Sequence, residues 1–320
     1  MNPCIIILLS AVGLLLLLFL TTLLCFLLVF YSPKRVPLTP DEYEIPKGDA
    51  YKPFIEDIIN WTDGIRNMKR EDVSITSSDG LTLRGKYYEY SKGAPIELMF
   101  HGYRGSAERD LCGGVHRCFS LGRNALIVDH RGAGESDGRV ITFGIKERID
   151  CLLWIKYATE RFGEDAKIII TGISMGAATV MMALNEDLPK NVIGAIADCG
   201  YTSPKEIITK VMRDIHVPPT IFYPLVKLGA KIFGRFDLEE TSAVEGVKKC
   251  KIPIIFIHGE SDTFVPCDMS IKLYNYCTAQ HKKLYTVPDT EHGLAYPKDP
   301  EAYYRVIREF DRECGFDFVK

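Results

Sequence analysis

The sequence lacks the patterns typical of nucleic-acid-binding and metal-binding proteins. Its 320 residues carry a formal net charge of −3, so there is no basic excess to attract a polyanion. Ten cysteines are present, but none forms a C-x-x-C pair and none has paired zinc spacing. We therefore predict no nucleic-acid partner and no metal site.

One group of residues offers an alternative to the prediction that the chain has no metal site. Cys112, His116 and Cys118 lie close together and contain metal-ligand side chains. They fall, however, on a predicted helix with its own apolar face, which favours a structural role. The many unpaired cysteines are typical of a reducing compartment, or of an organism that lives without oxygen.

Charge is absent from residues 5–31, where leucine dominates. As a helix this segment would be about 40 Å long, against a hydrocarbon core of about 30 Å. It is longer than a signal-peptide core of about 7–15 residues, and it lacks a basic flank before it and small residues for cleavage near its end. A buried core helix is disfavoured because no polar face exists. We predict an uncleaved single-pass membrane anchor over residues 1–31.

Positive side chains follow this span and none precedes it. Lys34 and Arg35 come directly after it, with Lys47 further on. The positive-inside rule then predicts an anchor in the cell membrane with the following domain in the cytoplasm, in agreement with the cysteine content.

Residues 32–70 connect the span to the rest of the chain. Residues 32–50 are polar and contain Pro33, Pro37, Pro40 and Pro46, which predicts a linker that holds the domain off the bilayer. Residues 51–70 have apolar side chains at helical spacing and predict an amphipathic helix that packs on the domain, with contact to the membrane surface as the alternative.

Predicted strands and helices alternate over residues 71–320. This order favours an α/β fold in which helices cover both faces of a mostly parallel sheet. Residues 201–247 interrupt the alternation and predict a short helical lid. Its Phe222, Tyr223, Leu225 and Val226 either line an acyl pocket or cover the core. Strands are expected at 72–76, 81–90, 95–101, 124–129, 168–171, 192–197, 252–258 and 283–287, with helices at 145–162, 269–278 and 301–310.

The most informative motif is Gly172-Ile173-Ser174-Met175-Gly176, between an apolar strand and a helix rich in alanine. A serine with glycines two residues to either side, at such a junction, is typical of a nucleophile elbow. Glycines let the chain turn tightly, and the hydroxyl then projects at the carboxyl edge of the sheet near a helix N-terminus. We predict Ser174 as a nucleophile.

A serine nucleophile needs a base, and the base needs an acid that orients it. In this architecture the acid follows the serine in the chain and the histidine comes last. Asp262 lies four residues beyond the strand at 252–258 and is favoured over Glu260 as the acid. His292 is the only histidine beyond the last strand, so it is the predicted base, whereas His258 is expected to form local hydrogen bonds.

Acyl transfer also needs donors for the oxyanion of the tetrahedral intermediate. The backbone N–H of Met175, directly after the nucleophile, is one predicted donor. The N–H of Tyr103 is the other, because it lies in a glycine-rich loop after the strand at 95–101.

Together these motifs resemble those of the α/β-hydrolase superfamily of serine hydrolases, and within it the membrane-anchored, serine-aminopeptidase-like hydrolase-domain proteins. The resemblance covers about residues 71–315. The matching motifs are His101-Gly102-x-x-Gly105-Ser106, Asp129-x-Arg131-Gly132-x-Gly134-x-Ser136, the elbow at Ser174, His258-Gly259-x-x-Asp262-x-x-Val265-Pro266, and His292-Gly293.

The resemblance implies hydrolysis of carboxylic esters, thioesters or amides through an acyl-enzyme, without a cofactor, on a small or lipid-like acyl substrate. A serine peptidase is the alternative. A dedicated peptidase of this superfamily often carries an extra propeller domain or an acid pocket for the substrate amine, and Glu135 and Asp137 are the candidates for such a pocket. A non-catalytic binding protein on the same fold is a third possibility, which the full set of motifs disfavours.

Overall fold

One eight-stranded sheet forms the centre of the computed structural model, which describes residues 2–33 and 39–316. The strand order is β1-β2-β4-β3-β5-β6-β7-β8, with β2 antiparallel to both neighbours and all other pairs parallel. The strands are β1 (Glu71–Thr76), β2 (Thr82–Tyr88), β3 (Ile96–Phe100), β4 (Asn124–Val128), β5 (Ile168–Ile173), β6 (Val192–Asp198), β7 (Ile254–Gly259) and β8 (Lys282–Val287).

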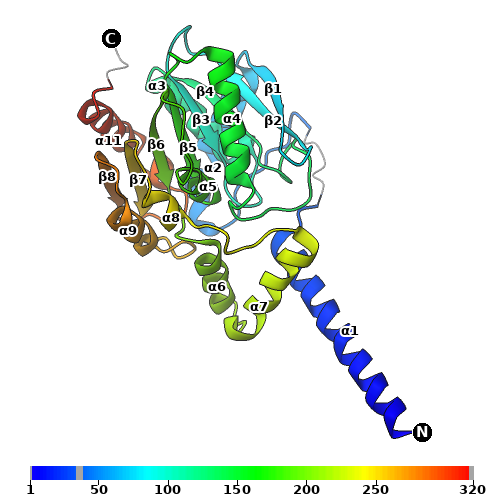
Figure 1. Ribbon diagram of the computed structural model, residues 1–320. Coiled ribbons are helices and arrows are strands. Elements are labelled where there is room, and N and C mark those ends of the chain that lie inside the picture. The colour runs from blue at the N-terminus through cyan, green and yellow to red at the C-terminus, as the bar shows by residue number, and fades with distance from the viewer. Residues whose placement is uncertain (1, 34–38, 317–320) are drawn as a thin grey trace.

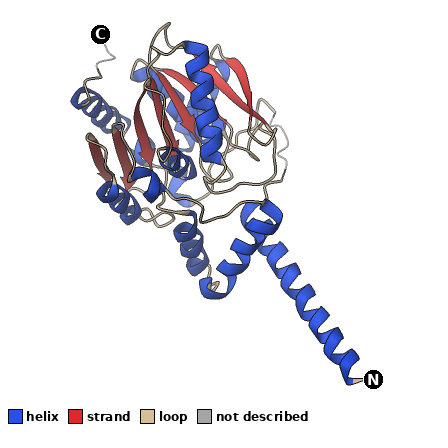
Figure 2. Ribbon diagram, viewed as in Figure 1, coloured by secondary structure: helices blue, strands red, loops and turns tan. Residues whose placement is uncertain are grey.

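Helices cover both faces of this sheet, which confirms the predicted α/β-hydrolase fold (Figures 1 and 2). Side chains of β3, β4 and β7 are buried along the whole of each strand, as expected for strands sandwiched between helices. One face packs against α4 (Glu147–Phe162), α5 (Met175–Ala183), α8 (Ala243–Val247) and α9 (Cys267–Tyr276). The other packs against α2 (Ile55–Asn67), α3 (Ala107–Ser120), α10 (Ala295–Lys298) and α11 (Pro300–Glu313).

The predicted amphipathic helix near residue 51 is a short 3₁₀ helix, η1 (Asp49–Phe54), followed by α2. Ile58 and Ile65 of α2 are buried in an apolar cluster that includes residues of α3, β3 and β4. This helix therefore packs on the domain, as the apolar spacing predicted, and its apolar face is not available to a membrane surface.

The predicted lid contains α6 (Pro204–Asp214), α7 (Pro219–Gly229) and a π-helical turn, η2 (Ala230–Gly234), ahead of α8. Tyr223 and Val226 of α7 are buried in an apolar cluster with Phe26 and Phe30. This arrangement supports the interpretation that the aromatic and aliphatic side chains of α7 cover a core.

The long apolar helix α1 (Pro3–Phe30) projects away from the sheet, and its C-terminal end is docked on the domain beside α7 (Figure 1). The Phe30 ring is fully buried, with ring centroids 5.9 Å from Phe143 and 5.3 Å from Phe236. The backbone then continues into a bridge between Tyr31 and Val140. The last turns of α1 are thus part of the folded domain.

The predicted linker over residues 32–50 does not separate the domain from α1. The domain contacts the end of α1 directly, and the later part of the predicted linker is packed on the domain. The Tyr43 hydroxyl donates to Asp63 at 2.7 Å, and Glu44 accepts from the Ser106 hydroxyl at 2.8 Å. Lys34, Arg35 and Pro37 lie outside the described residues.

Replacing the buried Phe30 with alanine should destabilise the domain, because it leaves a cavity among three aromatic rings. We expect Phe30→Ala to lower the free energy of unfolding by about 3–5 kcal/mol. Leu28→Ala is the matched control, since the Leu28 side chain is 64% exposed on the same helix. Thermal unfolding of the full chain in detergent measures both variants, and equal midpoints would contradict the docking of α1.

Candidate functional site

Ser174 lies at a sharp turn between β5 and α5 and has a strained backbone, with φ 56° and ψ −116°. The turn is possible because two glycines bring helix and strands into contact. A Cβ atom on Gly176 would lie 2.1 Å from the Phe100 carbonyl oxygen, and one on Gly172 would lie 2.1 Å from the Gly176 carbonyl carbon. Backbone atoms cannot give way at such distances, so both positions require glycine.

Three loops at the carboxyl edge of the sheet bring Ser174, His292 and Asp262 together. The His292 Nε2 atom lies 2.9 Å from the Ser174 Oγ atom, and its Nδ1 atom lies 2.6 Å from Asp262 Oδ2. Ser174 and Asp262 are both buried. Glu260, the competing acid, accepts instead from the Thr286 hydroxyl at 2.7 Å in an exposed position.

Asp262 is held by more donors than His292 alone. Its Oδ1 atom accepts the backbone N–H groups of Phe264 and Val265, at 2.9 and 2.8 Å. Its Oδ2 atom lies 3.1 Å from His258 Nε2, which also donates to the Val265 carbonyl oxygen. Burial alone would raise the pKa of Asp262, but the hydrogen bonds from His258 and His292 outweigh it and lower the pKa to about 2. The carboxylate therefore stays ionised at neutral pH.

The two predicted oxyanion donors flank the serine. Met175 is the first residue of α5, and Tyr103 follows Gly102, whose Cα lies close to the Ser174 side chain: a Cβ on Gly102 would be 3.5 Å from Ser174 Cβ. Within the part of the chain that the structure describes, neither N–H has a hydrogen-bond acceptor. Two unpaired donors beside a nucleophile can accept a developing negative charge.

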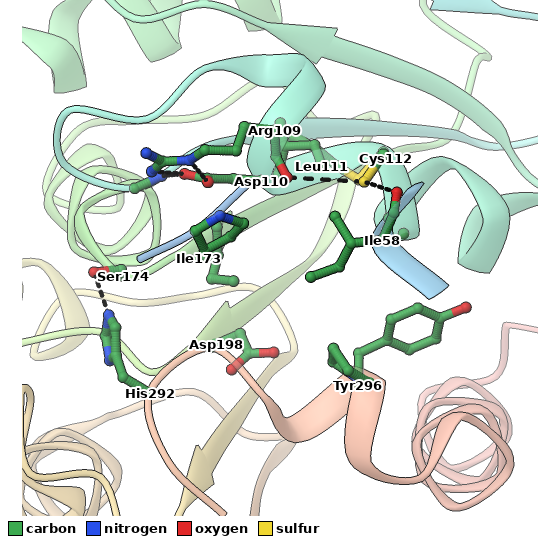
Figure 3. A pocket seen from close by; sticks show the side chains of 18 of the residues that line it. Ile58, Arg109, Asp110, Leu111, Cys112, Ile173, Ser174, Asp198, His292 and Tyr296 are labelled. Carbon is green, nitrogen blue, oxygen red and sulfur yellow. Dashed lines mark hydrogen bonds and ion pairs between the residues drawn. The ribbon is translucent and has the colours of Figure 1, made fainter. Parts of the chain in front are cut away.

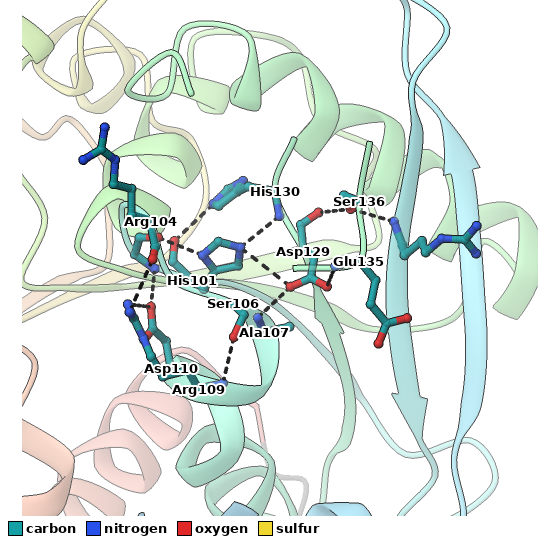
Figure 4. Close-up of polar contacts among 12 residues, drawn as sticks. His101, Arg104, Ser106, Ala107, Arg109, Asp110, Asp129, His130, Glu135 and Ser136 are labelled. Carbon is teal, nitrogen blue, oxygen red and sulfur yellow. Dashed lines mark hydrogen bonds and ion pairs between the residues drawn. The ribbon is translucent and has the colours of Figure 1, made fainter. Parts of the chain in front are cut away.

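A buried polar network holds the loop that contains Tyr103 (Figure 4). The His101 Nδ1 atom lies 2.8 Å from the Gly102 carbonyl oxygen, and its Nε2 atom accepts the backbone N–H of His130 at 3.0 Å. Asp129 accepts the N–H of Ala107 at 2.8 Å, which fixes the start of α3. The first two motifs of the sequence therefore brace the Tyr103 loop.

The Tyr103 loop is also tied to α1. The Tyr103 hydroxyl donates to the Val29 carbonyl oxygen at 2.6 Å, and the Arg104 guanidinium donates to the carbonyl oxygens of Leu28 and Tyr31, both at 2.9 Å. These carbonyls belong to the end of a helix, where acceptors are otherwise unsatisfied. The predicted membrane helix is thus in direct contact with the predicted oxyanion loop.

A cavity of about 200 Å³ opens beside Ser174 and His292 (Figure 3). Apolar side chains that line it include Ile58, Trp61, Met99 and Ile173. Neither Glu135 nor Asp137, the acids considered for a substrate amine, lines this cavity. Glu135 is instead paired with Lys86, and Asp137 accepts the Thr82 N–H, so both lie beside β2.

Sequence reasoning missed two residues at the cavity. Tyr51 of η1 donates its hydroxyl to the His292 carbonyl oxygen at 2.8 Å. No pattern in the sequence connects these distant positions. Asp198 lines the cavity at the carboxyl end of β6. An acid at that edge of a parallel sheet is a detectable signal, because ligands bind there in open α/β sheets.

The atoms closest to a metal-binding arrangement belong to Cys199, Asp262 and His292, within 4.8 Å of one another in the described part of the chain. Asp262 and His292 are already hydrogen-bonded to each other, and burial raises the pKa of the Cys199 thiol, which disfavours the thiolate that a metal needs. Two of the three residues that were considered as metal ligands from the sequence have other partners. The His116 Nδ1 atom lies 2.9 Å from the Tyr296 hydroxyl oxygen, and the Cys112 thiol donates to the Ile58 carbonyl oxygen.

Comparisons with known proteins bear on the family and on the fold. Residues 142–315 match the model of the prolyl oligopeptidase family, and they include Ser174, Asp262 and His292. Among solved structures, the esterase Pf2001 of Pyrococcus furiosus is similar in fold, with a TM-score of 0.65 and 23% sequence identity over 89% of this chain and 98% of that one.

Two curated relatives are similar in sequence. YqkD of Bacillus subtilis, an uncharacterized protein, is 26% identical over 61% of this chain and 64% of its own length. YNL320W of Saccharomyces cerevisiae, described as an uncharacterized membrane protein, is 27% identical over 61% of this chain and 63% of its own length. The chain thus spans somewhat less than two thirds of these relatives.

Replacing Asp262 by asparagine should leave the shape of the site intact but favour the wrong tautomer of His292. We expect Asp262→Asn to slow the reaction of Ser174 with a fluorophosphonate by about 10³- to 10⁴-fold. The matched control is Glu260→Gln, expected to change the rate by no more than about 2-fold, because its carboxylate is exposed and is hydrogen-bonded to Thr286. A larger loss in Glu260→Gln than in Asp262→Asn would reverse the assignment of the acid.

Proposed function

The chain belongs to the prolyl oligopeptidase family, and we propose that it is a membrane-anchored serine hydrolase that cleaves carboxylic esters or thioesters through an acyl-enzyme. The observation that carries this proposal is the continuous line of hydrogen bonds from Ser174 through His292 to Asp262. Such a line activates a hydroxyl that is otherwise a weak nucleophile at neutral pH.

In the proposed mechanism the Ser174 oxygen attacks the carbonyl carbon of the substrate while His292 Nε2 accepts the hydroxyl proton. The N–H groups of Tyr103 and Met175 donate to the oxyanion of the tetrahedral intermediate. His292 then gives its proton to the leaving alcohol or thiol, and the acyl group remains on Ser174. Water, deprotonated by His292, releases the acid and restores the serine. Asp262 stays ionised and stabilises the imidazolium that forms.

The cavity beside Ser174 bears on the acyl or leaving group that this site accepts. Apolar side chains, among them Ile58, Trp61 and Met99, form much of its lining and suit an aliphatic group. A serine peptidase is the second candidate, because the matched family is named for oligopeptide cleavage.

Mutation of the predicted nucleophile and base gives the direct test of the proposed hydrolase. The full chain in detergent should hydrolyse p-nitrophenyl butyrate and react with a fluorophosphonate. Ser174→Ala should abolish both, and His292→Ala should reduce kcat by about 10³-fold or more. Unchanged turnover in Ser174→Ala would overturn the mechanism. Faster cleavage of a matched anilide than of the ester would favour the peptidase.

We also propose that α1 is an uncleaved membrane anchor. A cleaved signal sequence would take Phe26, Phe30 and the Val29 carbonyl out of the folded domain, where they are buried or hydrogen-bonded. Thr22 is also buried, so the docked turns begin there and leave about 19 residues of α1, or about 29 Å of helix, which is close to the hydrocarbon core of about 30 Å.

The exposed side chains of the segment next to α1 support the inference that the domain lies against the bilayer. Helix α7 and η2 lie beside the docked end of α1, and α6 packs on α7 (Figure 1). Ile221, Leu228 and Ile232, on α7 and η2, are exposed. Exposed apolar side chains beside a membrane span are typical of contact with the lipid interface.

Orientation follows from charge and thiol chemistry. Lys34 and Arg35 follow the span, and all ten cysteines, which lie within the described residues, are free thiols. We therefore propose a cytoplasmic catalytic domain. Protease added to intact cells should leave the domain intact, whereas the same protease should digest it in inverted membrane vesicles. Digestion in intact cells, with a cytoplasmic marker protein still protected, would place the domain on the other side.

A further inference from the structure

Asp198 is a buried carboxyl group in the lining of the cavity, and one of its two oxygens has no hydrogen-bond partner in the described part of the chain. It is the last residue of β6, it is 6% exposed, and it lines the cavity with Ser174 and His292 (Figure 3). Its Oδ2 atom accepts the Tyr303 hydroxyl at 2.9 Å, whereas its Oδ1 atom has no hydrogen-bond partner in the described part of the chain. Such an orphan acceptor is costly unless a ligand or water satisfies it.

Asp198 is connected to a buried network of charged side chains that does not neutralise its negative charge. Tyr303 connects it to Arg117 through a contact of 3.2 Å, and Arg117 is paired with the buried Glu97. Glu97 also binds Arg123, and Arg123 binds Asp311. Among the described residues, this network holds three carboxyl groups and two guanidinium groups, so the carboxyl groups outnumber the guanidinium groups by one. Asp198 is the carboxyl group that lines the cavity.

The other charged side chains of the cavity lining are already compensated. Arg109 lies 2.5 Å from Asp110 and 3.6 Å from Glu44. Burial disfavours the ionised form of Asp198 and so raises its pKa. A cation beside Oδ1 would offset this cost of burying the charge.

We propose that Asp198 makes this cavity a binding site for a primary ammonium group of the substrate, so that the proposed hydrolase prefers esters that carry a free amine. The inference rests on the proposed function and deepens it. An ammonium nitrogen beside Oδ1 supplies both the missing donor and the missing positive charge. Aliphatic atoms between the amine and the scissile carbonyl would lie against the apolar part of the lining. Tyr303 acts as a positioning residue that holds the carboxyl group toward the cavity.

The test compares esters that differ only in the replacement of an ammonium group by a methyl group. Alanine methyl ester and methyl isobutyrate place the difference on the acyl side, whereas 4-aminobutyl butyrate and pentyl butyrate place it on the alcohol side. We expect one pair to show a kcat/KM ratio of about 10 to 100 in favour of the amine with the unmodified full chain. The pair that does so identifies the side of the scissile bond that enters the cavity.

Asp198→Asn keeps the shape of the side chain but removes its charge, and it should reduce that ratio to about 1. Tyr303→Phe should give an intermediate ratio. Glu135→Gln is the matched control, since Glu135 is the acid first considered for an amine and lies outside the cavity, and its ratio should equal that of the unmodified chain. Ratios near 1 for both pairs in the unmodified chain, or equal losses for all four esters in Asp198→Asn, would overturn the inference.

Failure of the proposed function is distinguishable from failure of this inference. If no ester is hydrolysed, calorimetric titration with butylammonium chloride still tests the cavity. Binding to the unmodified chain that is at least about 10-fold weaker in Asp198→Asn, with no binding of 1-butanol to either, supports the ammonium site. Absence of butylammonium binding, or equal binding to both proteins, rejects it.

Discussion

The close approach of α5 to the strands beneath it is the constraint on which the rest of the site depends. Gly176 lies directly against the Phe100 carbonyl, and Gly172 lies against the first turn of the helix. Only this contact lets Ser174 occupy a positive φ at the edge of the sheet while its N–H is held by the Asp198 carbonyl at 2.8 Å. The strain places the hydroxyl where a base can reach it, and it also places the N-terminus of α5 at the reacting centre.

A second dependence connects α1, the proposed membrane anchor, to the proposed catalytic site. The end of α1 is an integral part of the domain, and the side chain of Tyr103 is bonded to it. The proposed oxyanion donor is therefore held from two sides, by the His101 network within the domain and by the carbonyls of α1. The proposed anchor and the proposed oxyanion loop therefore meet at the C-terminal end of α1.

The buried charge of Asp198 is the basis of the proposed ligand preference of the cavity. The network of Glu97, Arg117, Arg123 and Asp311 is internally paired, and Asp198 extends it to the cavity with one charge uncompensated. An apolar cavity with one orphan acceptor discriminates strongly, because a ligand that lacks the matching donor leaves that acceptor desolvated and unpaired. The same serine, histidine and acid on another chain, without Asp198, would be expected to accept a broader set of esters.

The sequence by itself determined the α/β fold, the apolar N-terminal helix and the residues now found around Ser174. These features follow from local rules, because strand and helix periods, a glycine pair and the order of loops along a sheet edge are all written in consecutive residues. Asp198 was visible only as an acid at a strand end. The docking of α1, the bond from Tyr51 to His292 and the unpaired oxygen of Asp198 were decided by tertiary structure alone. Each depends on which distant groups meet, and on which buried polar atoms remain without partners, and no local pattern records either.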